Sequence, residues 1–119
     1  MPRFDFVAAV FLVVGCGHAQ AHAFLAKSEP AVGSTVTNAQ AVIRLEFTEA
    51  IEIAFSGIDM TNASGSALSL KAVRFADAAH KVLMADLPML TPGAYRVKWH
   101  VVSVDTHRTE GDFSFEVKH

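Results

Sequence analysis

The chain has 119 residues, of which 51% are apolar and 18% charged, and its formal net charge is −2. This composition excludes a disordered chain, and the charge excludes a nucleic-acid binder that acts through bulk positive charge. The single cysteine, Cys16, excludes an internal disulfide framework and any zinc or iron–sulfur site built from several cysteines.

The first element in chain order has the layout of a secretory signal peptide. Arg3 precedes the apolar run VAAVFLVVG at residues 7–15, and the small-x-small cleavage motif Ala-Gln-Ala follows at residues 19–21. We therefore expect residues 1–21 to be removed and one domain, residues 22–119, to remain. That domain contains no cysteine, so its stability depends on its hydrophobic core.

A second cleavage site competes with the first. Residues 13–16, VVGC, resemble a bacterial lipobox, in which Cys16 would become the lipidated first residue. Only cleavage after Ala21 leaves His22 as the first residue with a free α-amine. The choice of site therefore decides whether the amino terminus is available as a metal ligand.

The sequence of the domain that follows predicts a series of strands. Strict alternation of apolar and polar residues indicates strands at 42–48, 94–102 and 112–118. Shorter apolar pairs indicate others, at Ile58 with Met60, Leu68 with Leu70, and Val82 with Met84. Turn-forming residues separate these segments, and no long amphipathic helix is evident. About seven short strands predict an all-β domain, an immunoglobulin-like Greek-key β-sandwich with functional loops at its ends.

Three residues of this domain form a candidate metal site: His22, Asp105 and His107. An amino-terminal His22 offers its α-amine and its imidazole Nδ1, which can close one chelate ring. Asp105 and His107 are two apart, so on extended backbone both side chains point to the same side. The resulting set of three nitrogens and one carboxylate suits tetragonal copper(II) and lacks the soft ligands that copper(I) prefers. Taken singly, each residue is more often a solvated terminus, a turn residue or a surface histidine than a metal ligand.

Three segments carry a resemblance to a known family. They are HAFLAKSEPAVGSTV at residues 22–36, LEFTEAIEIAFSGIDM at residues 45–60 and YRVKWHVVSVDTHRTEGDFSFEV at residues 95–117. Together they resemble the CopC-like periplasmic copper-binding proteins, also called copper resistance proteins. The resemblance covers essentially all of residues 22–119, and its most specific part is the pairing of an amino-terminal histidine with a late Asp-x-His.

The resemblance implies a cupredoxin-like or immunoglobulin-like β-barrel or sandwich in the periplasm. It implies one copper(II) ion bound by the α-amine and imidazole of His22, by His107, and by Asp105 at a weaker or axial position. Glu49 falls where the family often has an acidic residue beside the ligands. The family also implies a partner, an inner-membrane copper protein of the CopD type, and a protein that is not an enzyme.

Some positions depart from the family pattern. Certain members have a methionine-rich loop that binds copper(I), whereas Met60, Met84 and Met89 are widely spaced here, and Met60 and Met84 fit the core better. We therefore expect no copper(I) site. Arg108 stands where the family often has proline, and His100 where many members have arginine.

These observations predict a monomeric, periplasmic copper(II)-binding protein that serves copper tolerance or homeostasis by sequestering or transferring the ion. Two alternatives stay open. A metal-free β-sandwich that binds a protein partner fits the fold equally well. A copper-brace oxidative enzyme uses similar ligands, but so small a domain leaves little room for a substrate-binding face, and the carboxylate would hinder oxygen activation.

Overall fold

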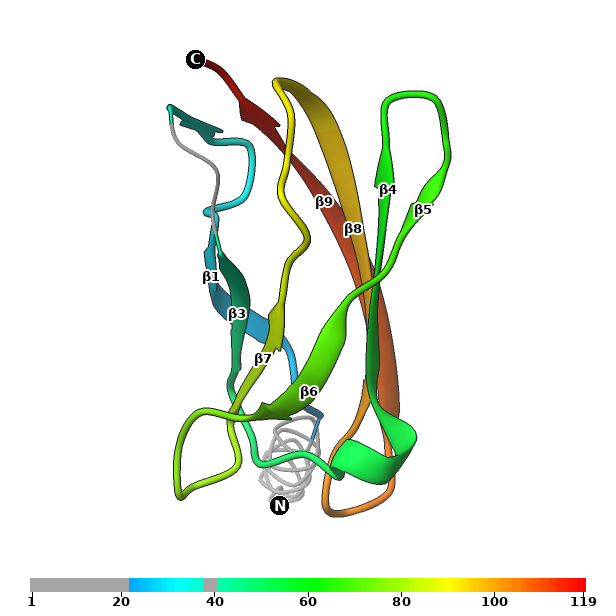
Figure 1. Ribbon diagram of the computed structural model, residues 1–119. Helices are drawn as coiled ribbons and strands as arrows, with labels where there is room; N and C mark the ends of the chain where they lie inside the picture. Colours follow the sequence, from blue (N-terminus) through cyan, green and yellow to red (C-terminus); the bar gives the residue numbers. More distant parts are fainter. Residues whose placement is uncertain (1–21, 38–40) are drawn as a thin grey trace, which may run out of the picture.

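The computed structural model of the protein describes residues 22–37 and 41–119 (Figure 1). The expected signal peptide, with its two competing cleavage sites, lies outside the described residues. Within those residues, no helix has the length and apolar character needed to cross a membrane.

The described chain is built almost entirely from strands, with one short 3-10 helix, η2 (Ile53–Phe55). The strands are β1 (Leu25–Glu29), β2 (Thr35–Val36), β3 (Val42–Phe47), β4 (Gly57–Asn62), β5 (Ala67–Leu68), β6 (Lys71–Phe75), β7 (Val82–Asp86), β8 (Gly93–Val102) and β9 (Arg108–Val117). They form a four-stranded sheet in the order β1-β3-β7-β6 and a five-stranded sheet in the order β2-β9-β8-β4-β5. Figure 1 shows the two sheets as facing layers, which confirms the predicted all-β sandwich.

The core lies between the two sheets and follows the alternation of the sequence. On β8, Tyr95, Val97, Trp99 and Val101 are all buried, while the residues between them face outward. Across the interior, the Phe47 ring of β3 meets the Trp99 ring edge-on, with ring centroids 5.2 Å apart. One apolar cluster therefore joins the two sheets and fixes their position relative to each other.

The prediction of which residues of β7 face the core was wrong. The sequence suggested that Val82 and Met84 share the core face, but Met84 is only half-buried, whereas Leu83 and Ala85 are fully buried. The cause is the register with β3, in which Leu83 pairs with Leu45. Paired residues share one face of a sheet, so the partner of a buried residue also points inward.

One end of the sandwich gathers segments from distant parts of the chain. Figure 1 shows the start of β1, η2, the β6–β7 loop and the β8–β9 loop together at this end, with the carboxyl terminus at the other. The predicted ligands belong to two of these segments. His22 lies in the short arm of residues 22–24 that precedes β1, and the other two ligands lie in the β8–β9 loop.

Candidate functional site

The arm of residues 22–24 is held in place by two threonines. The Phe24 N–H donates to Thr48 Oγ1 over 2.9 Å, and the Thr48 N–H donates to the Phe24 carbonyl, also over 2.9 Å. The Thr109 hydroxyl at the start of β9 donates to the carbonyl of Ala23, a residue that is fully buried. The arm is therefore fixed between the end of β3 and the start of β9, which brings His22 to the β8–β9 loop.

The β8–β9 loop, residues 103–107, is a tight turn rather than extended backbone. The Ser103 N–H donates to the His107 carbonyl over 2.9 Å, and the Thr106 N–H donates to the Ser103 carbonyl over 2.8 Å. Thr106 has a positive φ of 74°, the left-handed conformation that lets the chain reverse. The predicted extended geometry of Asp105 and His107 was wrong, because β8 and β9 are neighbours in the sheet and only a tight reversal can join them.

The turn nevertheless brings the three predicted residues together. The imidazole rings of His22 and His107 are tilted against each other, with centroids 4.5 Å apart. The Nδ1 of His107 also lies 3.3 Å from Asp105 Oδ1. Residues from both ends of the domain thus meet at one exposed point, as the candidate site requires.

The three side chains do not form a complete metal cage by themselves. Over residues 22–37 and 41–119, no group of three or more His, Cys, Asp and Glu residues has the spacing to hold a metal ion. The predicted site includes a further donor, the α-amine of His22. In the uncleaved chain that nitrogen belongs to a peptide bond, so it becomes a donor only after cleavage behind Ala21.

Asp105 is held in its charged form. The hydrogen bond donated by the Ser103 hydroxyl lowers the pKa of the Asp105 carboxyl below its ordinary value of 3.8, although desolvation opposes this. The hydrogen bond and charge of His107 lower the pKa of Asp105 further. The loop therefore presents an anionic oxygen at neutral pH, which is a suitable ligand for a divalent cation.

Sequence reasoning missed the residues that hold this site. Ser103 is only 1% exposed, and with Ser28 it is one of two buried polar residues in the described ranges. Thr48 and Thr109 are equally inconspicuous in the sequence. Ser103 lies within the segment 95–117 that carries the family resemblance, but nothing in that segment indicates that this serine is buried.

The other predicted residues are spread over the molecule. Glu49 is exposed and directly follows Thr48, so it lies next to the arm. Met60 is buried in the core as expected, whereas Met89 is 89% exposed. The His100 ring lies on the outer face of its sheet, against Gly57.

Exposed apolar side chains accompany the candidate site. Phe24, whose ring centroid is 6.1 Å from that of His22, is 52% exposed, and Val104 beside Asp105 is 57% exposed. Val104, Val102 and Phe55 line a shallow groove of about 680 Å³. The end that carries the candidate ligands thus also carries apolar surface.

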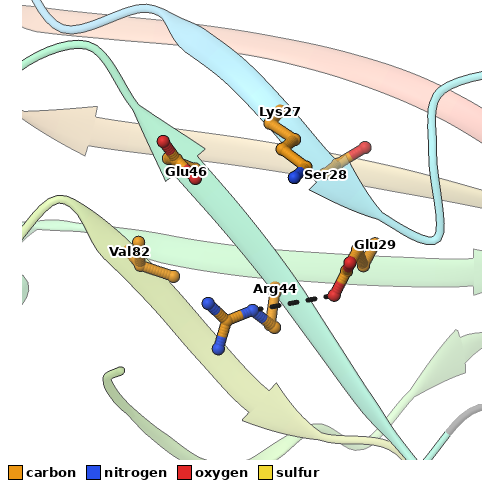
Figure 2. A pocket seen from close by; sticks show the side chains of 6 residues that line it. All are labelled: Lys27, Ser28, Glu29, Arg44, Glu46 and Val82. Carbon is orange, nitrogen blue, oxygen red and sulfur yellow. Dashed lines mark ion pairs between the residues drawn. The ribbon is translucent and has the colours of Figure 1, made fainter. Parts of the chain in front are cut away.

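A second hollow, beside β1, β3 and β7, is too small for an organic ligand. Figure 2 shows its charged side chains, including Arg44, whose Nε lies 3.7 Å from Glu29 Oε1. The hollow measures about 50 Å³, whereas pockets for organic ligands begin at about 300 Å³. Its charges are arranged as cross-strand neighbours, Lys27 with Glu46 and Glu29 with Arg44.

Comparison with known proteins gives consistent matches. The CopC domain matches residues 25–118. Protein YobA of Escherichia coli strain K12 is 39% identical over 99 residues, which cover 82% of this chain and 80% of YobA. Copper resistance protein C of Pseudomonas syringae pv. tomato is 41% identical over 107 residues, covering 84% and 83%. The crystal structure of PcoC, described as a methionine-rich copper resistance protein from Escherichia coli, superimposes with a TM-score of 0.75 at 35% identity, covering 82% of this chain and all of PcoC.

Proposed function

Because the chain belongs to the CopC family, we propose that it is a periplasmic copper-binding protein that serves copper resistance or transport. Two observations support this. Relatives over most of its length are named copper resistance proteins, and the candidate ligands of the sequence lie side by side at one end of the fold. The proposed role is to sequester or transfer the ion, and not to catalyse a reaction.

The proposed site binds one copper(II) ion through four donors. They are the α-amine and imidazole of His22, the imidazole of His107, and the carboxylate of Asp105 at a weaker or axial position. The observation that carries this assignment is the 4.5 Å separation of the two imidazole rings, with Asp105 beside one of them. Nitrogen and carboxylate donors favour copper(II) over copper(I), and copper(II) binds such a set more tightly than other common divalent ions do.

The proposal requires that the chain be processed. Residues 1–21 act as a secretory signal peptide, and cleavage after Ala21 creates the α-amine that completes the chelate. Cleavage at Cys16 would leave the nitrogen of His22 in an amide and would remove this donor. The mature protein, residues 22–119, acts as a monomer and exchanges copper with an inner-membrane protein of the CopD type, the partner that the family resemblance implies.

The experiment that tests this function is electron paramagnetic resonance (EPR) of the protein that begins at His22, with one equivalent of copper(II) and glycine as competitor. We expect an axial, nitrogen-rich spectrum that persists in the presence of glycine. The matched control is the same protein acetylated at the nitrogen of His22, which differs only in having an amide at that nitrogen. Copper in the acetylated protein should move to glycine.

Two outcomes would contradict the proposal. A spectrum of copper–glycine alone from the protein that begins at His22 would exclude the chelate. Equal binding by the two proteins would exclude the α-amine as a donor. Repeating the measurement with equimolar zinc tests selectivity, and we expect copper(II) to be retained because it stands above zinc in the order of divalent affinities.

A further inference from the structure

Ser103 is the first residue of the β8–β9 loop, which contains the two late candidate ligands, Asp105 and His107. The residue is only 1% exposed, although serine is usually found at the surface. A buried hydroxyl requires hydrogen-bond partners, because leaving it unpaired costs about 1–3 kcal/mol. The hydrogen-bond partners of the Ser103 hydroxyl therefore indicate its role.

The hydroxyl of Ser103 has three neighbours and one proton to donate. It lies within hydrogen-bond distance of Asp105 Oδ1, 3.2 Å from the His107 carbonyl oxygen, and 3.3 Å from the His107 backbone nitrogen. The backbone N–H can only donate, so Ser103 Oγ accepts from it. The single hydroxyl proton then goes to the Asp105 carboxylate, since a charged acceptor forms the stronger hydrogen bond.

These contacts connect Ser103, Asp105 and His107 to one another. The His107 N–H donates to Ser103, and Ser103 donates to Asp105 Oδ1. The same Oδ1 lies 3.3 Å from Nδ1 of the His107 imidazole. The backbone of His107 is thus linked to Asp105 Oδ1 through the buried serine, and the imidazole of His107 lies next to the same oxygen.

We propose that Ser103 is the positioning residue that sets Asp105 and His107 as one unit for the metal ion. This inference rests on the proposed function and adds an assignment of atoms to it. Asp105 Oδ1 accepts from Ser103, so Asp105 Oδ2 is the oxygen left for the ion. Asp105 Oδ1 lies 3.3 Å from His107 Nδ1, so the carboxylate and the imidazole are held next to each other, as two ligands of one ion must be.

The test measures copper(II) affinity by competition in the protein that begins at His22. Ser103→Ala should lower the affinity about tenfold, the effect of losing one hydrogen bond to a charged group. Ser103→Thr keeps the hydroxyl and should restore most of the affinity. A purely structural role of Ser103 would also lower the affinity, so these two variants alone are not sufficient.

A double-mutant cycle separates the two roles. If Ser103 acts through Asp105, then Ser103→Ala should have no further effect on copper affinity when Asp105 is already alanine. If Ser103 only holds the backbone of the loop, the tenfold loss should recur in the Asp105→Ala protein. An equal loss in both backgrounds would overturn the inference.

A further variant leaves the buried serine untouched, in case Ser103→Ala fails to fold. Asp105→Asn retains Oδ1 as an acceptor for Ser103 and replaces only Oδ2, at an exposed position. Copper affinity should fall to that of Asp105→Ala, and wild-type affinity in Asp105→Asn would overturn the assignment of Oδ2. Failure of the wild-type protein to bind copper would overturn the proposed function itself, which distinguishes it from a failure of the Ser103 assignment.

Discussion

At the scale of single residues, the side chains that hold the amino-terminal arm in place are different from the side chains that are candidate metal ligands. Thr48 and Thr109 hold the backbone of the amino-terminal arm through hydrogen bonds to residues 23 and 24. The imidazole of His22, one residue earlier, makes ring contacts with Phe24 and His107. The side chain that would bind the ion is therefore brought to the site by neighbours that take no part in binding.

The two late ligands are expected to contribute unequally. Asp105→Ala should lower copper(II) affinity by about ten- to a hundredfold, the range found when a group that orients a metal ligand is removed. His107→Ala should lower it more, because it removes a strong nitrogen donor and leaves Asp105 without its partner. Competition with a chelator of known affinity gives both values.

Glu110→Ala serves as the control for this pair, because Glu110 is an exposed acidic residue of β9 outside the cluster of His22, Asp105 and His107. Its removal should leave affinity unchanged. A larger loss from Asp105→Ala than from His107→Ala would contradict the assignment of the carboxylate to the weaker position.

The sequence was sufficient to find the three candidate ligands but not the geometry that joins them. A late Asp-x-His is visible as a pattern, and the expected convergence of Asp105 and His107 is confirmed by their 3.3 Å contact. The reason given for it, extended backbone, was wrong. The true cause is a turn closed by Ser103, and the burial of a serine depends on tertiary packing that no local pattern reveals.

At the scale of elements, β8 and β9 form the support on which the site rests. They pair along their whole length, from Gly93 with Val117 to Val102 with Arg108, and the candidate loop joins their ends. Gly111 of β9 lies opposite Trp99 of β8. A Cβ at Gly111 would lie 2.7 Å from Cζ2 of the Trp99 ring, so the indole occupies the space that a side chain would need.

Gly111→Ala should therefore destabilise the protein. The Trp99 ring is buried and packed edge-on against Phe47, so it has no free space into which it can retreat. Overpacking of this kind costs about 1–3 kcal/mol. The measurement is the free energy of unfolding from urea denaturation of the metal-free protein.

Gly57→Ala is the matched control. A Cβ at Gly57 would also approach another side chain to 2.7 Å, but that atom is Cε1 of His100, on the outer face of the sheet. This imidazole can rotate into solvent, so the substitution should be nearly neutral. Equal destabilisation by the two substitutions would show that the Trp99 contact is not the cause.

The strands were predicted best where one face of the strand is buried and the other is exposed. β3, β8 and β9 show clean alternation and were all expected, although β9 begins at Arg108, earlier than the predicted residue 112. β1, β2 and β6 were missed. Each is at an edge of its sheet, and few of their residues are buried, so the apolar signal is weak there.

At the scale of the whole molecule, the candidate site joins the two sheets. The arm with His22 leads into β1 of the four-stranded sheet, whereas Asp105 and His107 follow β8 of the five-stranded sheet. The sandwich topology brings these two sheet ends together, and this juxtaposition cannot be derived from the local periodicity of either segment. A bound ion would therefore link the two sheets at this end of the sandwich.

Copper(II) should therefore stabilise the mature protein as a whole. An ion that binds only the folded state raises the free energy of unfolding by about 2.7 kcal/mol when its free concentration is a hundred times the dissociation constant. The gain should shrink as the pH falls, because protons compete with copper for the imidazoles and the amine. Thermal unfolding with and without copper, at neutral and mildly acidic pH, measures both effects.

The protein acetylated at the nitrogen of His22 is the control for this stabilisation. It has the same core and the same side chains, and it lacks only the α-amine, so its unfolding temperature should respond much less to copper. His107→Ala should likewise lose most of the response, since the link to the five-stranded sheet is removed. An equal increase in unfolding temperature for all three proteins would mean that copper binds elsewhere, and the proposed bridge between the sheets would be wrong.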